Sequence, residues 1–284
     1  MSDELKGQVA IITGGGRGIG RTIAEGLAAA GAAVAVAGRS ASHLEDAVAA
    51  IEKAGGRAIA FPTDVTDQPA VRRLVAEAER RLGPIDLLVS NAAVEGPIGP
   101  LWELDTAEWR RCLEVNLMGP LICAQAVLPS MVARRRGRII NVASAGGIFP
   151  LPYDTGYSST KAALIRLSEV MAIECEEHGV SVFAIHPGIV HTGMSDTIMQ
   201  SEAGQKWEPR YGDALRDFAT PVAWAADLCV FLASGAADGL TGRFLSVTDD
   251  YRDLAGRAEE VRAGDLYTLR LNLTPQPPPP RPFQ

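Results

Sequence analysis

Short apolar runs alternate with amphipathic segments along most of the chain. The runs are rich in Val, Ile, Leu or Ala without clear polar alternation, as expected for strands that are covered on both faces. Seven runs predict strands: Val9–Thr13, Ala33–Ala37, Ala58–Phe61, Leu87–Ser90, Ile139–Val142, Val182–Ile185 and Phe244–Val247. The intervening segments predict helices near Ile19–Ala30, Ala41–Ala54, Gln68–Leu82, Thr106–Arg134, Tyr157–Glu177 and Pro221–Ala233. Strand–helix repetition with right-handed crossovers predicts an α/β fold, a doubly wound parallel sheet of the Rossmann type with helices on both faces.

Two segments interrupt this repetition. Residues 192–220 follow the sixth predicted strand and carry several glycines and aromatics, so we expect a substrate lid there. Residues 1–250 are then one nucleotide-binding and catalytic domain that includes the lid, and residues 251–284 are a C-terminal extension. We expect a helix within Tyr251–Leu271, and an extended or disordered, proline-rich end over Thr274–Gln284.

Composition narrows the classes of function. A net charge of −7 argues against a protein that coats nucleic acid. The four cysteines are widely spaced without a CxxC pair, and the four histidines lack metal-ligand spacing, so we expect reduced thiols and no metal site. No apolar run is expected to reach membrane-spanning length, and the polar start leads directly into a strand. We therefore expect a cytoplasmic protein with no nucleic-acid or membrane partner.

A glycine-rich turn stands between the first predicted strand and the first helix. Its spacing is G-x-x-x-G-x-G from Gly14 to Gly20, which differs from the common G-x-G-x-x-G. Glycines there permit a sharp turn and let backbone N–H groups approach a pyrophosphate at the helix start. We therefore predict nucleotide binding by residues of this turn: Gly14, Gly16, Arg17, Gly18, Ile19 and Gly20.

The end of the second predicted strand indicates which nucleotide binds. An NAD site usually carries an Asp or Glu there, whereas this chain has Gly38, Arg39 and Ser40. A guanidinium can hold a 2′-phosphate, and Arg17 offers a second cation nearby. The sequence therefore favours NADP(H) over NAD(H), with Asp64-Val65 lying along the adenine.

Tyr157 and Lys161 are four residues apart in a predicted helix, so their side chains lie on one face. An ammonium near a phenol favours the phenolate, and such a pair can exchange a proton close to neutral pH. Beside a nucleotide-binding turn, this proton is expected to accompany a hydride. Together the two features indicate carbonyl–alcohol redox chemistry.

The ordered motifs resemble those of the short-chain dehydrogenases/reductases, in the subfamily of single-domain chains of about this length. They extend from Val9 to about Val247 and comprise Thr13-Gly14-x-x-x-Gly18-x-Gly20, Asp64-Val65, Asn91-Ala92-Ala93, Asn116, Ser144, Tyr157-x-x-x-Lys161 and Pro187-Gly188. Two departures stand out. The Asn91 motif has Ala where the family often has Gly, and a tail of over thirty residues follows the last strand, where many relatives stop.

The resemblance implies a catalytic tetrad. Tyr157 would be the general acid for ketone reduction, and Ser144 would hold the substrate oxygen beside it. Lys161 would bind the nicotinamide ribose and, with the oxidised ring, lower the pKa of the phenol. Asn116 would help to keep a water that links Lys161 to solvent. The resemblance also implies cofactor contacts from Asn91, Ala92 and Ala93, from Tyr157 and Lys161 themselves, and from the nicotinamide loop residues Pro187, Gly188, Ile189 and Thr192.

The resulting hypothesis is an NADP(H)-dependent oxidoreductase acting on a ketone or secondary alcohol. The alternatives are an NAD-dependent secondary-alcohol dehydrogenase and a nucleotide-binding regulator without turnover, which has no use for an intact Ser–Tyr–Lys set. Mostly apolar side chains are expected to face the substrate, which favours an apolar or cyclic compound: Val94, Glu95, Ile148, Phe149, Tyr153, Met194, Trp207 and Tyr211. Long apolar helices also predict a homo-dimer or homo-tetramer.

Overall fold

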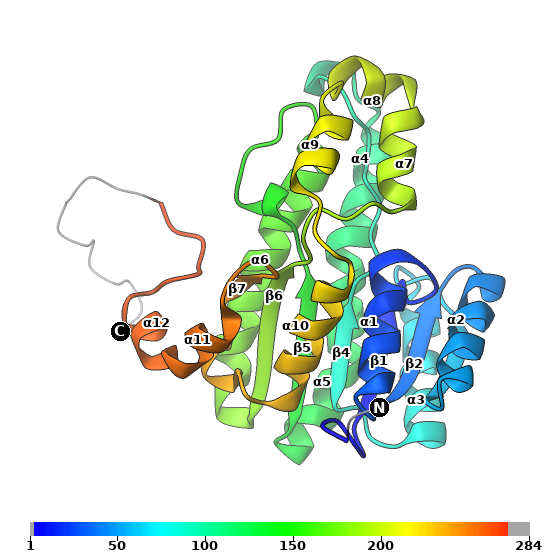
Figure 1. Cartoon of the computed structure of the whole chain (residues 1–284), viewed down its shortest axis with the longest axis vertical. Coiled ribbons are helices and arrows are strands. Elements are labelled where there is room, and N and C mark those ends of the chain that lie inside the picture. The colour runs from blue at the N-terminus through cyan, green and yellow to red at the C-terminus, as the bar shows by residue number, and fades with distance from the viewer. Residues whose placement is uncertain (1–2, 272–284) are drawn as a thin grey trace.

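A seven-stranded parallel sheet forms the centre of the protein (Figure 1). The structure is a computed structural model that describes residues 3–271, so the expected proline-rich end over 274–284 lies outside the described residues. The strands are β1 (Val9–Thr13), β2 (Ala33–Gly38), β3 (Arg57–Pro62), β4 (Leu87–Ser90), β5 (Gly137–Val142), β6 (Val180–His186) and β7 (Phe244–Ser246). Their order is β3-β2-β1-β4-β5-β6-β7, and every pairing is parallel. The predicted fold class is confirmed.

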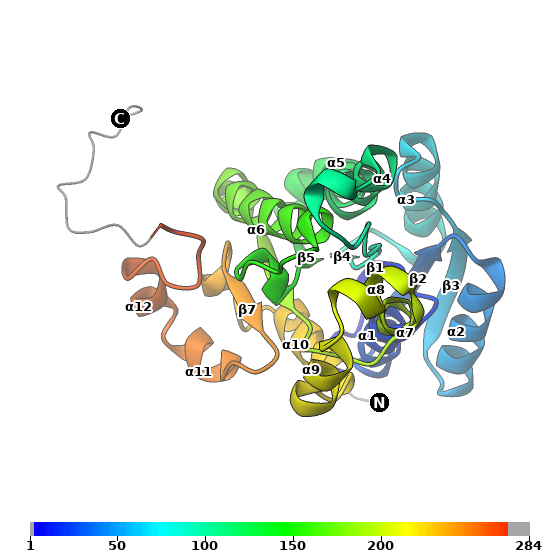
Figure 2. The ribbon, with the colours of Figure 1, turned by 90° about the horizontal axis from the view of Figure 1, so that it is seen from above.

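Helices cover both faces of this sheet, as the view from above shows (Figure 2). On one face lie α1 (Gly18–Ala29), α2 (Ala41–Lys53) and α10 (Ala223–Ser234), and on the other lie α3 (Gln68–Leu82), α4 (Thr106–Leu113), α5 (Gly119–Arg134) and α6 (Thr155–Cys175). Successive residues of one strand enter different cores: Ile11 packs with α3 and α5, whereas Ile12 packs with α1 and α10. This double burial explains why the strand sequences are apolar at every position.

The connection order reverses at the centre of the sheet. From β1 the chain moves outward to β2 and β3, then crosses back to β4 on the other side of β1. The loops that follow β1 and β4 therefore diverge at the carboxyl ends of adjacent strands. Ligands of open α/β sheets bind in the crevice that this divergence leaves.

The long helix expected over Thr106–Arg134 is divided in two. A π-helical turn, Glu114–Met118, separates α4 from α5, and Asn116 is buried in it. By length and composition the stretch could cross a membrane, so our expectation that no apolar run is long enough is wrong. Its apolar face is nevertheless used inside the fold, because Cys123, Val127 and Met131 pack into the core beneath the sheet. Core helices of soluble proteins pass the same test of length and composition.

The segment expected to be a lid folds into three short helices beyond the carboxyl end of β6 (Figure 1). They are α7 (Gly193–Gln200), α8 (Glu202–Trp207) and α9 (Tyr211–Phe218). Side chains cap the first two, since the Thr192 hydroxyl accepts from Ser195 N and the Ser201 hydroxyl accepts from Gly204 N. At its end the segment returns to the sheet side, where Thr220 N donates to Ile189 O over 2.8 Å.

The C-terminal extension lies against the β7 edge of the sheet. The helical structure expected within Tyr251–Leu271 is present as two short helices, α11 (Tyr251–Gly256) and α12 (Ala258–Ala263), and residues 264–271 are not helical. Gly256 and Gly264 stand at the two helix ends, which explains the interruption. Past them, Tyr267 O accepts a hydrogen bond from Phe244 N, and Leu269 packs on a small cluster that contains Ala143. The extension therefore packs on the same small cluster as Ala143, the residue that precedes Ser144.

A buried carboxylate holds the end of this extension in place. The side chain of Glu169 on α6 is 8% exposed and accepts from Arg270 over 2.6 Å. We expect Arg270→Ala to release residues 264–271, because it removes this ion pair and leaves Arg166 as the remaining partner of Glu169. The free energy of unfolding should fall by about 1–3 kcal/mol in urea titration, and limited proteolysis near Leu266 should accelerate. Arg73→Ala, an exposed arginine on α3, is the control. Equal behaviour of the two variants would show that this contact does not anchor the extension.

Candidate functional site

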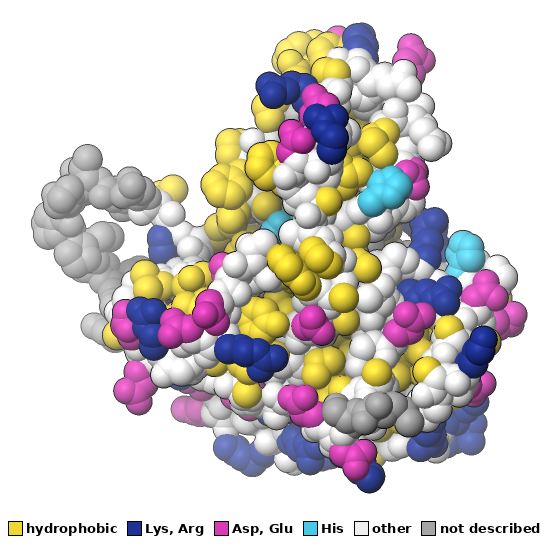
Figure 3. All heavy atoms as spheres, viewed as in Figure 1, with side chains coloured by type: hydrophobic (Ala, Val, Ile, Leu, Met, Phe, Trp, Pro, Cys, Tyr) yellow, Lys and Arg dark blue, Asp and Glu magenta, His cyan; other side chains and the backbone are white. Residues whose placement is uncertain are grey.

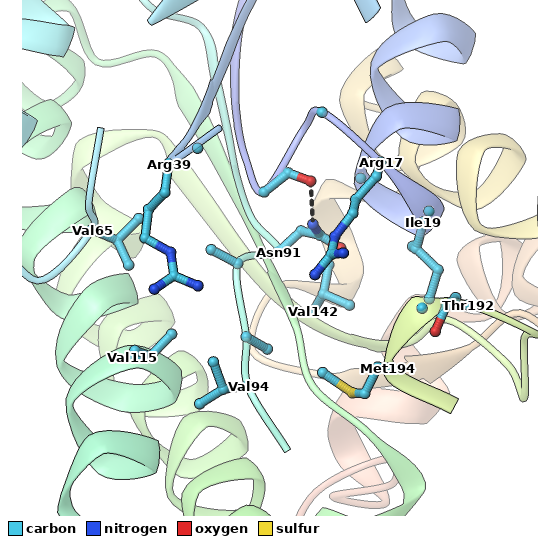
Figure 4. A pocket seen from close by; sticks show the side chains of 18 of the residues that line it. Arg17, Ile19, Arg39, Val65, Asn91, Val94, Val115, Val142, Thr192 and Met194 are labelled. Atoms are coloured by element: carbon cyan, nitrogen blue, oxygen red, sulfur yellow. Dashed lines mark hydrogen bonds between the residues drawn. The ribbon is translucent and has the colours of Figure 1, made fainter. Parts of the chain in front are cut away.

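A cavity of about 480 Å³ opens at the carboxyl ends of β1, β2 and β4, where the connections diverge. Most of the expected cofactor-binding residues line it: Gly14, Gly16, Arg17, Gly18, Ile19, Gly20, Arg39, Ser40, Asp64, Val65, Asn91, Ala92, Ala93, Tyr157, Lys161, Pro187 and Thr192. Its volume lies in the range of cofactor and ligand pockets. Figure 4 shows the side chains that project into it from the glycine-rich turn, from β2 and from the start of the lid.

The glycine-rich turn is shaped by a close approach to the loop after β4. A Cβ on Gly14, whose φ is +65°, would lie 2.7 Å from Asn91 Nδ2, and a Cβ on Gly20 would lie 2.3 Å from the same atom. Asn91 Nδ2 donates to Thr13 O over 2.9 Å and to Gly14 O over 3.3 Å. Side chains at the two glycines would separate the turn from this amide, so both positions exclude other residues.

Thr13 is a contributor that our sequence reasoning did not place in the site. Its hydroxyl accepts from Asn91 N over 3.0 Å and from Ala92 N over 3.1 Å, and it donates to Val89 O. One buried side chain thus joins the ends of β1 and β4. The sequence did contain a signal for this role. Thr13 ends a buried strand next to a glycine turn, and a buried hydroxyl requires hydrogen-bond partners.

Two arginines project into the cavity from opposite sides. Figure 4 shows the guanidinium groups of Arg17 and Arg39 pointing into the space between the glycine-rich turn and the end of β2. Arg111 and His43 also line this region, and the sequence reasoning missed both. Asp64 is not free to replace the absent carboxylate of β2, because Thr66 and Arg111 already engage it. This part of the cavity suits an anionic group.

Two expected cofactor contacts, Gly188 and Ile189, lie outside the cavity lining. Gly188 has a φ of +87°, and a Cβ there would meet the Thr220 hydroxyl at 1.9 Å. Ile189 pairs with Ala219 in an isolated parallel bridge. The two residues join the lid to the end of β6. The local sequence does not indicate this role, because their partners lie at the other end of the lid.

The proton-transfer candidates meet at the start of α6. Tyr157 lies in its first turn and Lys161 one turn later, with Lys161 Nζ 5.3 Å from the centre of the Tyr157 ring. Lys161 is 2% exposed, and its Nζ donates to Val142 O over 2.8 Å. Ser144 follows β5, its hydroxyl accepts from Gly146 N, and it contacts the Tyr157 phenol. The structure therefore brings these three side chains together, as expected.

Asn116 binds the loop after β4, and the water that it is expected to keep beside Lys161 stays a prediction. Its amide clamps Val94, since Oδ1 accepts from Val94 N and Nδ2 donates to Val94 O, both over 2.8 Å. Among residues 3–271 no hydrogen bond joins it to Lys161. The π-helical turn supplies this geometry, and such turns are frequent at functional sites. Asn116 therefore fixes the loop that carries Val94 into the cavity.

The protein's own groups do not lower the pKa of the Tyr157 phenol. Burial raises this pKa well above its ordinary value, the charge of Glu95 raises it further, and only the Ser144 hydrogen bond opposes them. Burial also lowers the pKa of Lys161 to about 8. Desolvation of the phenolate therefore outweighs the nearby ammonium among these side chains, and the expected lowering of the pKa by Lys161 together with the oxidised ring stays a prediction.

Acidic side chains surround the phenol, which the sequence indicated only in part. Glu95 was an expected substrate contact, whereas Asp154 at the start of α6 and Glu208 at the end of α8 were missed. Burial, followed by the charge of Glu208, raises the pKa of Glu95 to about 7. Nothing in the local sequence links positions 95, 154 and 208, since only the folded arrangement of the loop after β4, the start of α6 and the lid brings them together.

The remaining substrate candidates divide into two groups. Met194 and Val94 line the cavity, and Tyr153 stacks on Trp207 of the lid with ring centres 4.9 Å apart. Ile148 and Phe149 are exposed, and on the face shown in Figure 3 apolar side chains gather over the upper, projecting part of the molecule. His191 pairs with Asp196 over 2.8 Å and is not among the residues that line the cavity. Within residues 3–271, no cluster of His, Cys, Asp or Glu could hold a metal.

The pH dependence of turnover tests the influence of Glu95. We expect Glu95→Gln to lower the pKa of Tyr157, because the variant lacks a negative charge that opposes the phenolate. In alcohol oxidation the phenolate is the base, so the acidic limb of the pH profile of kcat/KM should move to lower pH by about 0.5–1 unit. Glu103→Gln, an exposed glutamate further along the same loop, is the control. An unchanged limb in Glu95→Gln would contradict the assignment.

Comparisons with known proteins agree with this geometry. Residues 8–203 match the family model described as short chain dehydrogenase. The chain is 34% identical to a short chain dehydrogenase of Pseudocercospora fijiensis, over 95% of this chain and 89% of the relative. It is 35% identical to cis-4-hydroxycyclohexanecarboxylate dehydrogenase of Sinomonas cyclohexanicum, over 88% of this chain and 99% of that protein. The crystal structure of levodione reductase superposes with a TM-score of 0.78 at 27% identity, covering 90% of this chain and 99% of that one.

Proposed function

The chain belongs to the short-chain dehydrogenase family, and on this premise we propose that it is an NADP(H)-dependent oxidoreductase that interconverts a ketone and a secondary alcohol. Oxidoreduction is the activity named for the relatives that it resembles. One observation carries the proposal: Tyr157, Lys161 and Ser144 meet beside a cavity whose glycine-rich turn suits a dinucleotide.

The cofactor, when bound, supplies or accepts the hydride. Backbone N–H groups at the start of α1 would hold its pyrophosphate, as glycines at this position permit. Lys161 would bind the nicotinamide ribose hydroxyls. The Lys161 ammonium is oriented for this by its hydrogen bond to Val142 O, which fixes Nζ at the edge of the cavity.

The phenol and the serine hydroxyl act on the substrate oxygen. Ser144 would donate a hydrogen bond to the carbonyl oxygen and hold it beside the phenol. Tyr157 would then give its proton to the developing alkoxide during reduction, and its raised pKa keeps that proton in place at neutral pH. Oxidation would reverse these steps, with the phenolate as base.

The preference for NADP(H) rests on charge. Arg39 stands at the end of β2, where NAD-binding relatives of this fold carry a carboxylate, and Arg17 faces the same part of the cavity. Two guanidinium groups favour a 2′-phosphate over a free hydroxyl. Titration with both reduced cofactors is the direct test, and tighter binding of NADH would support the alternative NAD-dependent dehydrogenase.

We propose a cyclic secondary alcohol or ketone as the substrate. Relatives with 35% identity include cis-4-hydroxycyclohexanecarboxylate dehydrogenase, and the stacked pair Tyr153 and Trp207 provides an apolar wall near the phenol. Cyclic ketones and alcohols should be screened with NADPH and NADP at the nicotinamide absorbance. Tight NADPH binding without turnover across the panel would instead favour a nucleotide-binding regulator.

We also propose that the protein is a cytoplasmic homo-dimer or homo-tetramer. On the outer face of α6, Val170 is 42% exposed and Ile173 is 68% exposed, which is apolar surface that a second subunit could cover. Sedimentation at micromolar concentration tests the assembly, and a single monomeric species would refute it.

A further inference from the structure

We propose that the reaction site contains a subsite for a cationic group, so that the preferred substrate is a cyclic alcohol or ketone that carries an ammonium substituent. This inference rests on the proposed function. Three carboxyl groups form the subsite: Glu95, Asp154 and Glu208, which lie close enough to Tyr157 or to one another to influence their mutual titration. The proton and hydride transfers proposed above use none of them.

Three separate segments converge to build this acid subsite. Glu95 follows Val94, whose backbone is clamped by Asn116, so the loop after β4 is held in position. The same loop reaches Tyr153, because Gly99 N donates to Tyr153 O over 2.8 Å, and Asp154 is the next residue. The lid lies against the second segment, because Trp207 stacks on Tyr153, and Glu208 directly follows Trp207 at the end of α8. These backbone and side-chain contacts bring the three acids into one region.

Asp154 has an oxygen that no protein group satisfies. The residue is 2% exposed, and its Oδ1 has no hydrogen-bond partner among the described residues. The backbone N–H of Tyr157 faces its carboxyl. A buried polar atom without a partner costs free energy, and native proteins rarely leave one unsatisfied. An unpartnered acceptor next to the proton donor points to a ligand group that donates a hydrogen bond there.

The acid subsite also lacks a counter-charge. Glu95, Asp154 and Glu208 form no ion pair within residues 3–271, and Lys161 is the cation that influences Glu95. Lys161 already donates to Val142 O and is assigned to the cofactor ribose. The three carboxyls have no metal-binding geometry either, since no group of acids in the described range could hold a metal ion. The missing partner is therefore an organic cation.

An ammonium group fits better than a hydroxyl or a carboxylate. A hydroxyl would satisfy Asp154 Oδ1 without balancing the charge, and a carboxylate would be repelled. Burial, followed by the charges of Glu95 and Glu208, raises the pKa of Asp154 to about 9, so this acid holds a proton at neutral pH. A bound ammonium would release the proton by stabilising the carboxylate, and its affinity should therefore rise with pH. Tyr211 lies near the same three acids, and aromatic rings attract cations.

The test compares 4-substituted cyclohexanols of similar size with the intact enzyme and its preferred cofactor. The substituents are amino, methyl, hydroxyl and carboxylate, each as the cis and trans isomer. We expect kcat/KM for 4-aminocyclohexanol to exceed that for 4-methylcyclohexanol at least about tenfold, with the carboxylate slowest. The amino-to-methyl ratio should fall about tenfold in both Asp154→Asn and Glu208→Gln. The control Glu202→Gln, an exposed acid on α8, should keep the wild-type ratio.

Binding provides a second readout that does not need turnover. With the NADP complex, cyclohexylammonium should raise Tm more than cyclohexanecarboxylate, and Asp154→Asn should abolish the difference. A carboxylate that binds or reacts as well as the amine would overturn the inference, as would a ratio unaffected by either variant. If no alcohol is oxidised with either cofactor, the proposed function fails, and the Tm comparison still decides the cation preference. Asp154→Asn is isosteric with the protonated acid, so this variant is expected to fold.

Discussion

Replacing Tyr157 with phenylalanine should lower kcat by a factor of about 10²–10⁴ while leaving NADPH binding intact. The variant removes the proton donor and keeps the ring, which lies 5.3 Å from Lys161 Nζ. Lys161 keeps its hydrogen bond to Val142 O, so the ribose-binding ammonium stays in place. Steady-state assays in both directions measure the loss, and fluorescence titration with NADPH measures binding.

A matched control separates the loss of the hydroxyl from a general effect of the substitution. Tyr251→Phe removes a phenol that packs against Phe231, far from the reaction site. Its kcat should stay within about twofold of the wild type. Activity of Tyr157→Phe at the level of this control would show that another group supplies the proton.

Exchanging Arg39 for aspartate should reverse the cofactor preference. The variant loses a guanidinium that faces the cavity and places a carboxylate where NAD-binding sites carry one. A charged hydrogen bond contributes about 1.5–3 kcal/mol, and repulsion of the 2′-phosphate adds to its loss. The ratio of the Kd values for NADPH and NADH should therefore change about 10²-fold or more, as measured by calorimetry.

Lys53→Asp is the control for this experiment, since it makes the same charge change at the far end of α2. The cofactor ratio should be unaffected by it. Arg17→Ala should weaken NADPH more than NADH, in the same direction as Arg39→Asp but by less. If Arg39→Asp and Lys53→Asp gave the same ratio, the charge argument for NADP(H) would be wrong.

The fold was predictable from the sequence, because a sheet that is buried on both faces has a recognisable hydrophobic pattern in its strands. Strands such as Val9–Thr13 are apolar at every position, since Ile11 and Ile12 enter different cores. Helix ends were less predictable. The division of α4 from α5 follows from the amide of Asn116, which must reach Val94, and that contact joins residues 22 positions apart.

The cofactor cavity was predictable for a similar reason. Its contacts come from short motifs at strand ends, and parallel strands place all their carboxyl ends at one edge. Arg111 escaped notice because it lies on α4, outside every motif that the sequence offered. The packing of Gly188 and Ile189 against the lid was not predictable, because their partners, Thr220 and Ala219, lie about thirty residues further along the chain.

The sequence by itself determined the sheet, the dinucleotide turn and the tyrosine–lysine pair, because each depends on local spacing and on burial common to a whole strand or helix face. Tertiary structure alone decided the electrostatics of the reaction site. Burial raises the pKa of Tyr157 instead of lowering it, and the lid brings Glu208 to Glu95 and Asp154. Desolvation and charge repulsion act through space over a few ångströms, whereas these acids are separated in the chain by more than fifty residues.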